Sequence, residues 1–243
     1  MKASRLRSVD VRRVRHLLSR VRPHRTVPAR VEALSASLLG CRYEAHGLVG
    51  SADVPEAFVA PLESFDCVTY VETVLALARS RDPEGFAREL RRIRYDGGEV
   101  AWERRNHYMT GWARRNARAG VVKGVPAGAL ATRKEKLLDA VPGLPPRRAR
   151  FACVPKARFA ALAPRLANGD VLLFASTKAN LDVFHCGFLV KGGGAWRLRH
   201  ASRSAGRVVE EELSPFLRAN RMAGLIVVRL LEATDPEPGK ERT

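Results

Sequence analysis

Cys67, His185 and His200 are the residues of this sequence whose types and positions could support nucleophilic catalysis. After Cys67, apolar residues recur at the spacing of a helix, at Val68, Val71, Val74, Leu75 and Ala78. With Ser64 or Asp66 as the cap, Cys67 is expected in the first turn of a largely buried helix, where backbone N–H groups and the dipole favour a thiolate. Such a thiolate is a nucleophile if a histidine can reach it. Equally, a free cysteine can serve as a small buried apolar residue.

Two histidines fall on neighbouring predicted strands. Period-two alternation places His185, Gly187 and Leu189 on one face of the strand over 183–190, and Phe184, Cys186 and Phe188 on the other. On the next strand, over 196–201, His200 shares a face with Leu198. A tight hairpin would make the two imidazoles neighbours, one a base and the other its orienter. The alternative is that each is a hydrogen-bonded core histidine.

The elements that must position these residues are helices first and strands second. Helices are predicted before Pro23 and over 28–39, 66–79 and 83–94, and around Trp112. Asp96-Gly97-Gly98 predicts a hairpin turn within 94–102. Residues 120–155 are interpreted as a long irregular connection. Strands are predicted over 170–175, 183–190, 196–201 and 224–231, with a helix or turn at 213–220. This order predicts an α+β fold with an antiparallel sheet.

The chain of 243 residues is strongly basic, with a net charge of +18. Residues 1–30 hold Lys2 and nine arginines against Asp10, and Val11, Val14, Leu18 and Val21 predict a short amphipathic helix there. This arm either binds anionic polymers such as nucleic acid, acidic lipid or cell-wall polymer, or is simply solvated. We favour the solvated arm, because no aromatic residue lies between the arginines for base stacking.

Cysteine usage and hydropathy bear on location. Four scattered cysteines without a Cys-x-x-Cys pair indicate reduced thiols. No apolar run approaches the ~20 residues of a membrane span. Arginines interrupt the N-terminal stretch, so no signal peptide is visible. A cytoplasmic location is expected, or a periplasmic or extracellular one if the start is misassigned or the chain is an exported effector.

Five motifs in order connect the sequence with a known group. They are Leu38-Leu39-Gly40-x-x-Tyr43, Phe65-Asp66-Cys67-Val68-Thr69-Tyr70-Val71-Glu72, Arg105-Asn106-His107-Tyr108, Phe184-His185-Cys186-Gly187-Phe188 and His200-Ala201-Ser202. Together, over roughly residues 31–231, they resemble the N-acetylmuramoyl-L-alanine amidase-like branch of the NlpC/p60 cysteine peptidases.

The resemblance implies a papain-like fold, with the nucleophile helix packed on an antiparallel sheet. It implies hydrolysis of an amide bond in peptidoglycan stem peptides, either the N-acetylmuramoyl-L-alanine bond or the γ-D-glutamyl-diamino acid bond. Cys67 would be the nucleophile, His185 the general base and His200 the residue that orients it. Muropeptides would be the substrates, with no cofactor and no metal. We expect a monomer with a basic arm at 1–30, a catalytic domain at 31–232 and a flexible tail at 233–243.

The resemblance also implies roles around this centre. Tyr43 would line the site and help the Cys67 N–H to hold the oxyanion. Asp66 matches an aspartate that binds the free amine of the leading alanine in some relatives, but Val68 stands where those relatives often have serine. Asn106, His107 and Tyr108 match a branch-specific motif near the cleft, taken here as substrate-binding.

Other functions remain open at this stage. An acyltransferase or lipid hydrolase of the same superfamily would use the same cysteine and histidines. A non-catalytic basic module that binds cell wall or nucleic acid would instead show steep salt-dependent affinity and no role for Cys67.

Overall fold

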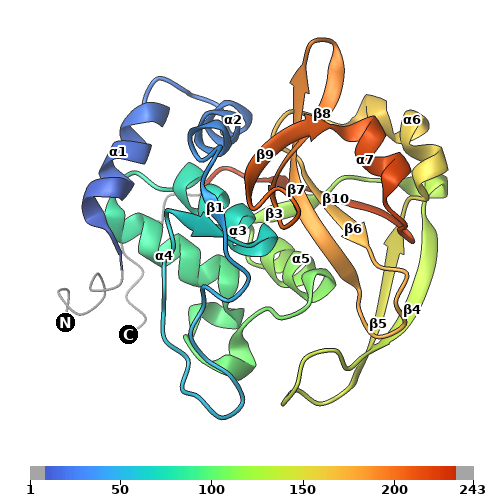
Figure 1. Cartoon of the computed structure of the whole chain (residues 1–243), viewed down its shortest axis with the longest axis horizontal. Coiled ribbons are helices and arrows are strands. Elements are labelled where there is room, and N and C mark those ends of the chain that lie inside the picture. The colour runs from blue at the N-terminus through green and yellow to red at the C-terminus, as the bar shows by residue number, and fades with distance from the viewer. Residues whose placement is uncertain (1–8, 234–243) are drawn as a thin grey trace, which may run out of the picture.

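The structure, a computed structural model, describes residues 9–233 (Figure 1). Residues 1–8 of the basic arm and residues 234–243 of the predicted tail lie outside the described part. Five helices of at least ten residues belong to the N-terminal half: α1 (Val11–Val21), α2 (Val27–Ser37), α3 (Cys67–Ala78), α4 (Pro83–Arg94) and α5 (Met109–Arg118). Two shorter α-helices follow, α6 (Phe159–Leu162) and α7 (Leu213–Ala219).

An eight-stranded sheet curls beside the helices (Figure 1), in the order β2-β1-β9-β8-β7-β6-β10-β3, and most of its strands come from the C-terminal half of the chain. The strands are β1 (Arg42–Tyr43), β2 (Ser64–Phe65), β3 (Val122–Gly124), β6 (Val171–Ala175), β7 (Val183–Gly192), β8 (Ala195–Ser202), β9 (Arg207–Glu212) and β10 (Gly224–Leu230). The expectation of an antiparallel sheet needs a correction at one edge, where β1 and β2 are parallel. A long loop, residues 44–63, separates these two strands and returns the chain to the same direction.

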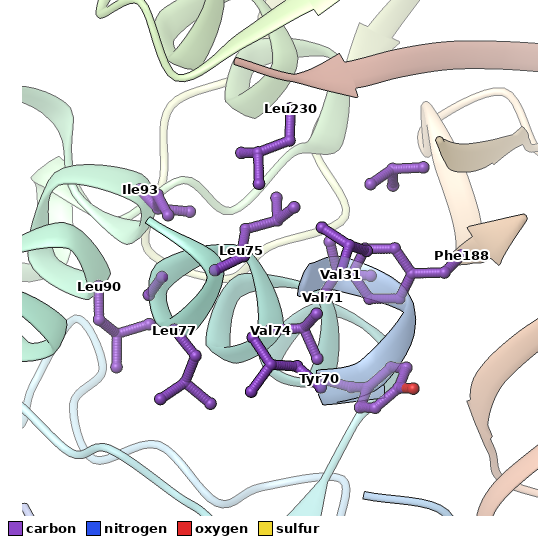
Figure 2. Close-up of a cluster of buried hydrophobic side chains, with 14 of the residues drawn as sticks. Val31, Tyr70, Val71, Val74, Leu75, Leu77, Leu90, Ile93, Phe188 and Leu230 are labelled. Atoms are coloured by element: carbon purple, nitrogen blue, oxygen red, sulfur yellow. The ribbon is translucent and has the colours of Figure 1, made fainter. Parts of the chain in front are cut away.

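Helix α3 lies at the centre of the main core (Figure 2). Its residues from Thr69 to Ala78 are all buried, and their side chains pack against α2, α4 and β7. Figure 2 shows Val71 and Tyr70 on the side of Phe188 from β7, and Leu77 on the side of Leu90 from α4. A helix that is apolar on every side must be enclosed, so the core fixes where its first residue lies.

A buried ion pair joins α3 to α4. Arg94 Nε lies 2.7 Å from Glu72 Oε2, and the two side chains are only 1% and 2% exposed. Arg94 also donates to the carbonyl of Val59 at 2.6 Å, which ties the long loop to the same point. The pair therefore connects the nucleophile helix to α4 and to the long loop.

The amphipathic helix expected before Pro23 is present as α1. Asp10 caps it by accepting from the N–H of Arg13 at 2.9 Å. Val14, Leu17, Leu18 and Val21 are buried in the same core as α3. Residues 11–21 are therefore part of the folded body and not a solvated arm.

The two faces of β7 belong to different cores, as the predicted alternation requires. Cys186 and Phe188 pack in the core with α3, whereas Leu189 packs with Leu198 in a second core that α7 covers. The sheet thus carries helices on both faces, and the His185 face of β7 is the one turned toward α7.

Two sequence-based expectations are wrong, and one strand was missed. Residues 120–155 are not irregular, because they hold β3 and a two-stranded hairpin of β4 (Thr132–Leu138) and β5 (Arg147–Cys153). Strand β9 was not expected at all. The segment 94–102 is no hairpin: residues 96–98 form a 3-10 turn, in which Gly97 has φ +69 and Gly98 has φ +74.

Candidate active site

Cys67 occupies the first position of α3, as expected from the sequence. Asp66 is the N-cap, and its Oδ1 accepts from the Thr69 N–H at 2.7 Å while Thr69 Oγ1 accepts from the Asp66 N–H at 2.9 Å. This capping box fixes the backbone around the cysteine. The first amide groups of a helix have no partner within it, so the N–H of Cys67 is free of the helical ladder.

The two histidines predicted to be neighbours are in contact. His185 Nε2 lies 2.6 Å from His200 Nδ1. Gly187 makes this possible, because a Cβ at that position would come within 2.8 Å of His200 Cβ. The missing side chain lets His200 on β8 lean diagonally across to His185 on β7.

A third residue, Glu211 on β9, continues this chain. His200 Nε2 lies 2.7 Å from Glu211 Oε1. His200 pairs with Val209 across the two strands, so Glu211 lies two residues along on the same face. The three side chains therefore cross three adjacent strands in one line of hydrogen bonds.

The hydrogen bonds determine which nitrogens carry protons when Glu211 is ionised. The carboxylate can only accept, so His200 Nε2 must donate to it. In neutral His200, Nδ1 is then the acceptor, and His185 Nε2 donates to it. His185 Nδ1 is left without its proton and can take one from Cys67.

Aromatic rings enclose the imidazole pair. The ring of Phe216 on α7 lies 5.8 Å from His185 and 5.6 Å from His200, and Phe174 stacks on His185 at 5.9 Å. Burial lowers the pKa of His200, the charge of His185 lowers it further, and the hydrogen bond to Glu211 opposes both effects. The orienting histidine is thereby held in its neutral form.

The surroundings of the Cys67 thiol favour its charged form. The neighbouring Cys186 side chain lowers the pKa of Cys67 well below the ordinary value; burial opposes this, and His185 lowers it further by hydrogen bond and charge. Cys186 also lies beside the helix start, where its Sγ donates to the Cys67 carbonyl at 3.1 Å. The pKa of Cys186 itself is raised, by its contact with Cys67 and by burial.

Tyr43 and Asp66 lie beside Cys67. Tyr43 pairs with Phe65, the residue before Asp66, across β1 and β2. Burial raises the pKa of the Tyr43 hydroxyl, and the charges of Cys67 and Asp66 raise it further, so this phenol is a hydrogen-bond donor at neutral pH. Burial and the neighbouring Cys67 raise the pKa of Asp66 to about 6.

The structure places Asn106, His107 and Tyr108 elsewhere. None of the hydrogen bonds found within residues 9–233 joins these three side chains to Cys67, His185 or His200. Asn106 is buried, donating to the Ile93 carbonyl at 3.1 Å and accepting from Arg115 at 2.5 Å. His107 and Tyr108 line a separate cavity, described below.

Sequence reasoning missed two contributors, Glu211 and Cys186. Glu211 sits in Arg-Val-Val-Glu-Glu-Glu, where three successive acidic residues conceal the alternation of a strand. Cys186 was placed only as an apolar residue opposite His185. In the described part of the chain, no group of three or more His, Cys, Asp or Glu side chains is arranged to hold a metal ion. The helices described there are also too short or too polar to cross a membrane.

Comparison with known proteins decides the family. A sequence model of the AmiA-like proteins, described as N-acetylmuramoyl-L-alanine amidase-like, matches residues 33–225. The chain belongs to this AmiA-like family. The match runs from α2 into β10 and includes every residue of the candidate site. None of the curated proteins compared with the chain matches it.

Solved structures share the AmiA-like fold. An N-acetylmuramoyl-L-alanine amidase from Bacteroides uniformis is 24% identical, with a TM-score of 0.77 over 85% of this chain and 99% of that one. Protein LPG0564 from Legionella pneumophila is 21% identical, with a TM-score of 0.79 over 91% of this chain and 94% of that one. These likenesses establish the α+β fold with its curled, mixed sheet.

Proposed function

We propose that this AmiA-like protein is a thiol-dependent amidase that cleaves an amide bond in peptidoglycan stem peptides. The observation that carries the proposal is the continuous set of contacts from Cys67 through His185 and His200 to Glu211. It puts an ionised thiol at a helix N-terminus beside a histidine whose free nitrogen can exchange a proton. The arrangement agrees with what the resemblance to the papain-like NlpC/p60 peptidases implies.

The first half of the reaction forms an acyl-enzyme. The Cys67 thiolate attacks the amide carbonyl carbon, and the resulting oxyanion is held by the Cys67 backbone N–H and the Tyr43 hydroxyl. His185, protonated at Nδ1, gives that proton to the departing nitrogen as the C–N bond breaks. A thioester on Cys67 and a free amine result.

The second half returns the enzyme to its starting state. His185, now neutral, takes a proton from a water molecule while the oxygen of that water attacks the thioester carbonyl carbon. The C–S bond breaks, the carboxylic acid leaves, and Cys67 becomes a thiolate paired with protonated His185. His200 and Glu211 touch neither substrate nor thiol, and act by holding the His185 ring in place.

The family favours one of the two bonds that the sequence left open. Its description and the Bacteroides relative both point to the bond between N-acetylmuramic acid and L-alanine. We therefore propose muropeptides as substrates, cleaved at that bond. The alternative cut, at the γ-D-glutamyl-diamino acid bond, would release different fragments.

The test is incubation of the purified protein with muropeptides, followed by mass spectrometry of the products. Wild type is compared with Cys67→Ala and with Cys41→Ala, a control that removes another partly buried thiol. Cleavage lost only in Cys67→Ala supports the proposal, and the fragment masses identify the bond. No cleavage by the wild type, with Cys67 unreactive toward alkylating agents, would instead indicate a binding module.

A further inference from the structure

A second cavity, apart from Cys67, has a strongly cationic wall. It measures ≈ 380 Å³, and its lining includes Arg105, Arg115 and Arg147 together with His107, Tyr108 and two carboxylates, Asp96 and Glu103. It lies between the start of α5, the segment that precedes it and the tip of the β4–β5 hairpin, and Leu144 and Pro145 of that tip supply an apolar wall.

Arg115 and Arg147 lie side by side over α5. A Cβ built on Gly111 would meet one terminal nitrogen of Arg147 at 2.8 Å and one of Arg115 at 3.4 Å. Both guanidinium groups therefore reach the same small region, which a side chain at position 111 would fill. Burial lowers the pKa of Arg115, and the charge of Arg147 contributes to that lowering.

Carboxylates inside the protein compensate this charge only weakly. Asp96 Oδ2 is 4.0 Å from Arg115 Nε, which itself bonds to Asn106. Arg147 stacks over the Tyr108 ring at 5.0 Å and has no ion pair within residues 9–233. Arg105 differs, because Glu56 holds it at 3.2 Å. Two adjacent guanidinium groups can chelate one carboxylate or phosphate.

His107 adds an acceptor to the same wall. Burial and the surrounding arginines lower its pKa to about 4, so the ring is neutral at pH 7. Its Nε2 lies 2.8 Å from the Trp102 carbonyl and must donate to it. Nδ1 is then an acceptor, suited to an N–H or O–H group that accompanies the anion.

The cavity is coupled to the segment that carries His185. Asp182, three residues before His185, accepts from the backbone N–H and hydroxyl of Thr110 at 2.7 and 2.6 Å. Leu181 packs against Tyr108. The start of α5, which forms the cavity, and the start of β7, which carries the base, are therefore held together.

We propose that Arg115 and Arg147 form a carboxylate subsite for the peptide part of the substrate, with His107 accepting from a neighbouring amide N–H. A carboxylate next to an amide is the chemistry of a peptide that ends in, or branches to, a free acid. The assignment rests on the proposed function, since stem peptides carry such carboxylates. It gives His107 of the Arg-Asn-His-Tyr motif a role in binding the substrate at a place apart from the Cys67 thiol.

The experiment measures binding separately from cleavage. Calorimetry on Cys67→Ala compares a stem tetrapeptide that has free carboxylates with the same peptide amidated, and with inorganic phosphate. Arg147→Gln in the Cys67→Ala background is expected to raise the Kd for the free acid about tenfold or more. The Kd for the amidated peptide should not change. Arg148→Gln, the next residue on β5, is the matched control because its side chain is 79% exposed and faces Glu135.

Several outcomes would overturn the subsite. Equal affinity for the free and amidated peptides would do so, as would an unchanged Kd in Arg147→Gln when its circular dichroism and melting temperature match those of the parent. Displacement of the peptide by phosphate at equal concentration would assign the site to phosphate instead.

The subsite and the proposed function can fail independently. In the enzyme with Cys67, Arg147→Gln should raise KM for muropeptide and leave kcat nearly unchanged. If the wild type cleaves muropeptide and KM is unaltered in Arg147→Gln, the carboxylate subsite is contradicted and the amidase function is not. Carboxylate-dependent binding by Cys67→Ala with no cleavage by the wild type would remove the amidase alone.

Discussion

Glu211 on β9 accepts a hydrogen bond from His200 Nε2 at 2.7 Å, and this bond determines which nitrogen of His185 is free to face Cys67. Glu211→Gln keeps the shape but lets an amide N–H face His200, which permits the wrong tautomer. We expect kcat/KM on muropeptide to fall by roughly 10². Glu212→Gln, on the next residue, should leave it unchanged. Equal rates for the two variants would mean that Glu211 has no positioning role.

The Cys67 thiolate should persist at pH values where an ordinary thiol is protonated. Its pKa is lowered well below the usual value by Cys186 and His185, whereas burial raises the pKa of Cys41 and Cys153. Iodoacetamide should therefore label Cys67 first. The rate at which Cys67 is alkylated should stay nearly constant as the pH falls below 8. Peptide mapping by mass spectrometry can follow the labelling of each cysteine.

Cys186→Ala tests the cause of that depressed pKa. Without the Cys186 thiol, the midpoint of the alkylation profile of Cys67 should move to higher pH, and His185→Ala should move it in the same direction. Cys153→Ala, in which a distant buried thiol is removed, is the control. An unmoved midpoint in Cys186→Ala would show that Cys186 is only a packing residue.

Asp66 should make the free energy of unfolding depend on pH. Its pKa of about 6 in the fold lies above the ordinary value of 3.8, so the folded state binds the proton more tightly. Its contribution to stability is fully present below pH 3.8 and is lost as the pH rises through about 6. Urea titrations at several pH values in this range measure the free energy of unfolding. That of the wild type should fall relative to that of Asp66→Asn as the pH rises. Parallel pH curves would contradict the raised pKa.

Removing one partner of the Glu72–Arg94 pair should destabilise the fold strongly. Arg94→Met leaves a buried carboxylate without its counter-ion, which costs about 3–5 kcal/mol. The double variant Glu72→Leu with Arg94→Met should recover much of that loss, because no buried charge then remains. Chemical denaturation measures the free energy of unfolding of the wild type, of Arg94→Met and of the double variant. Glu135→Gln, which breaks an exposed pair with Arg148 and Arg150, is the control and should cause no measurable change.

The exposed arginines of α1 allow a test of the alternative in which the N-terminal segment binds anionic polymers. Deleting residues 1–30 would remove Val14, Leu17 and Leu18 from the core, so it confounds binding with folding. A triple variant in which Arg12, Arg15 and Arg20 are replaced by glutamine keeps the buried face of α1 unchanged. We expect weaker, less salt-dependent pelleting with cell-wall sacculi. Unchanged pelleting of a folded triple variant would exclude this helix as the contact.

The sequence predicted the parts of the fold that bury continuous apolar faces. Helix α3, the strands β6, β7, β8 and β10, and the meeting of His185 with His200 all follow from apolar periodicity. Strand β4, Thr-Arg-Lys-Glu-Lys-Leu-Leu, shows no such pattern, because its stability comes from pairing with β5 and from Lys136, whose Nζ donates to the carbonyls of Ser176 and Leu181 at 2.6 and 2.9 Å.

The same reasoning explains what was missed at the candidate site. Glu211 is recognisable only once β9 is known to lie beside β8, a pairing that acidic residues do not reveal. His107 and Tyr108 were expected at the cleft, yet their positions depend on the hairpin tip, which the sequence suggested was irregular. The positions of Glu211 and of His107 and Tyr108 are thus determined by contacts between segments far apart in the chain, which local propensity does not reveal.

The line of hydrogen bonds across β7, β8 and β9 also runs from the interior to the surface. The side chain of His200 is 3% exposed, whereas that of Glu211 is 43% exposed and meets bulk water. The two imidazoles and the carboxylate therefore connect the region of the thiol to solvent at β9, along one face of the sheet. Because the Glu211 carboxylate meets water, its charge is solvated when it is ionised, although the histidine that it orients is buried.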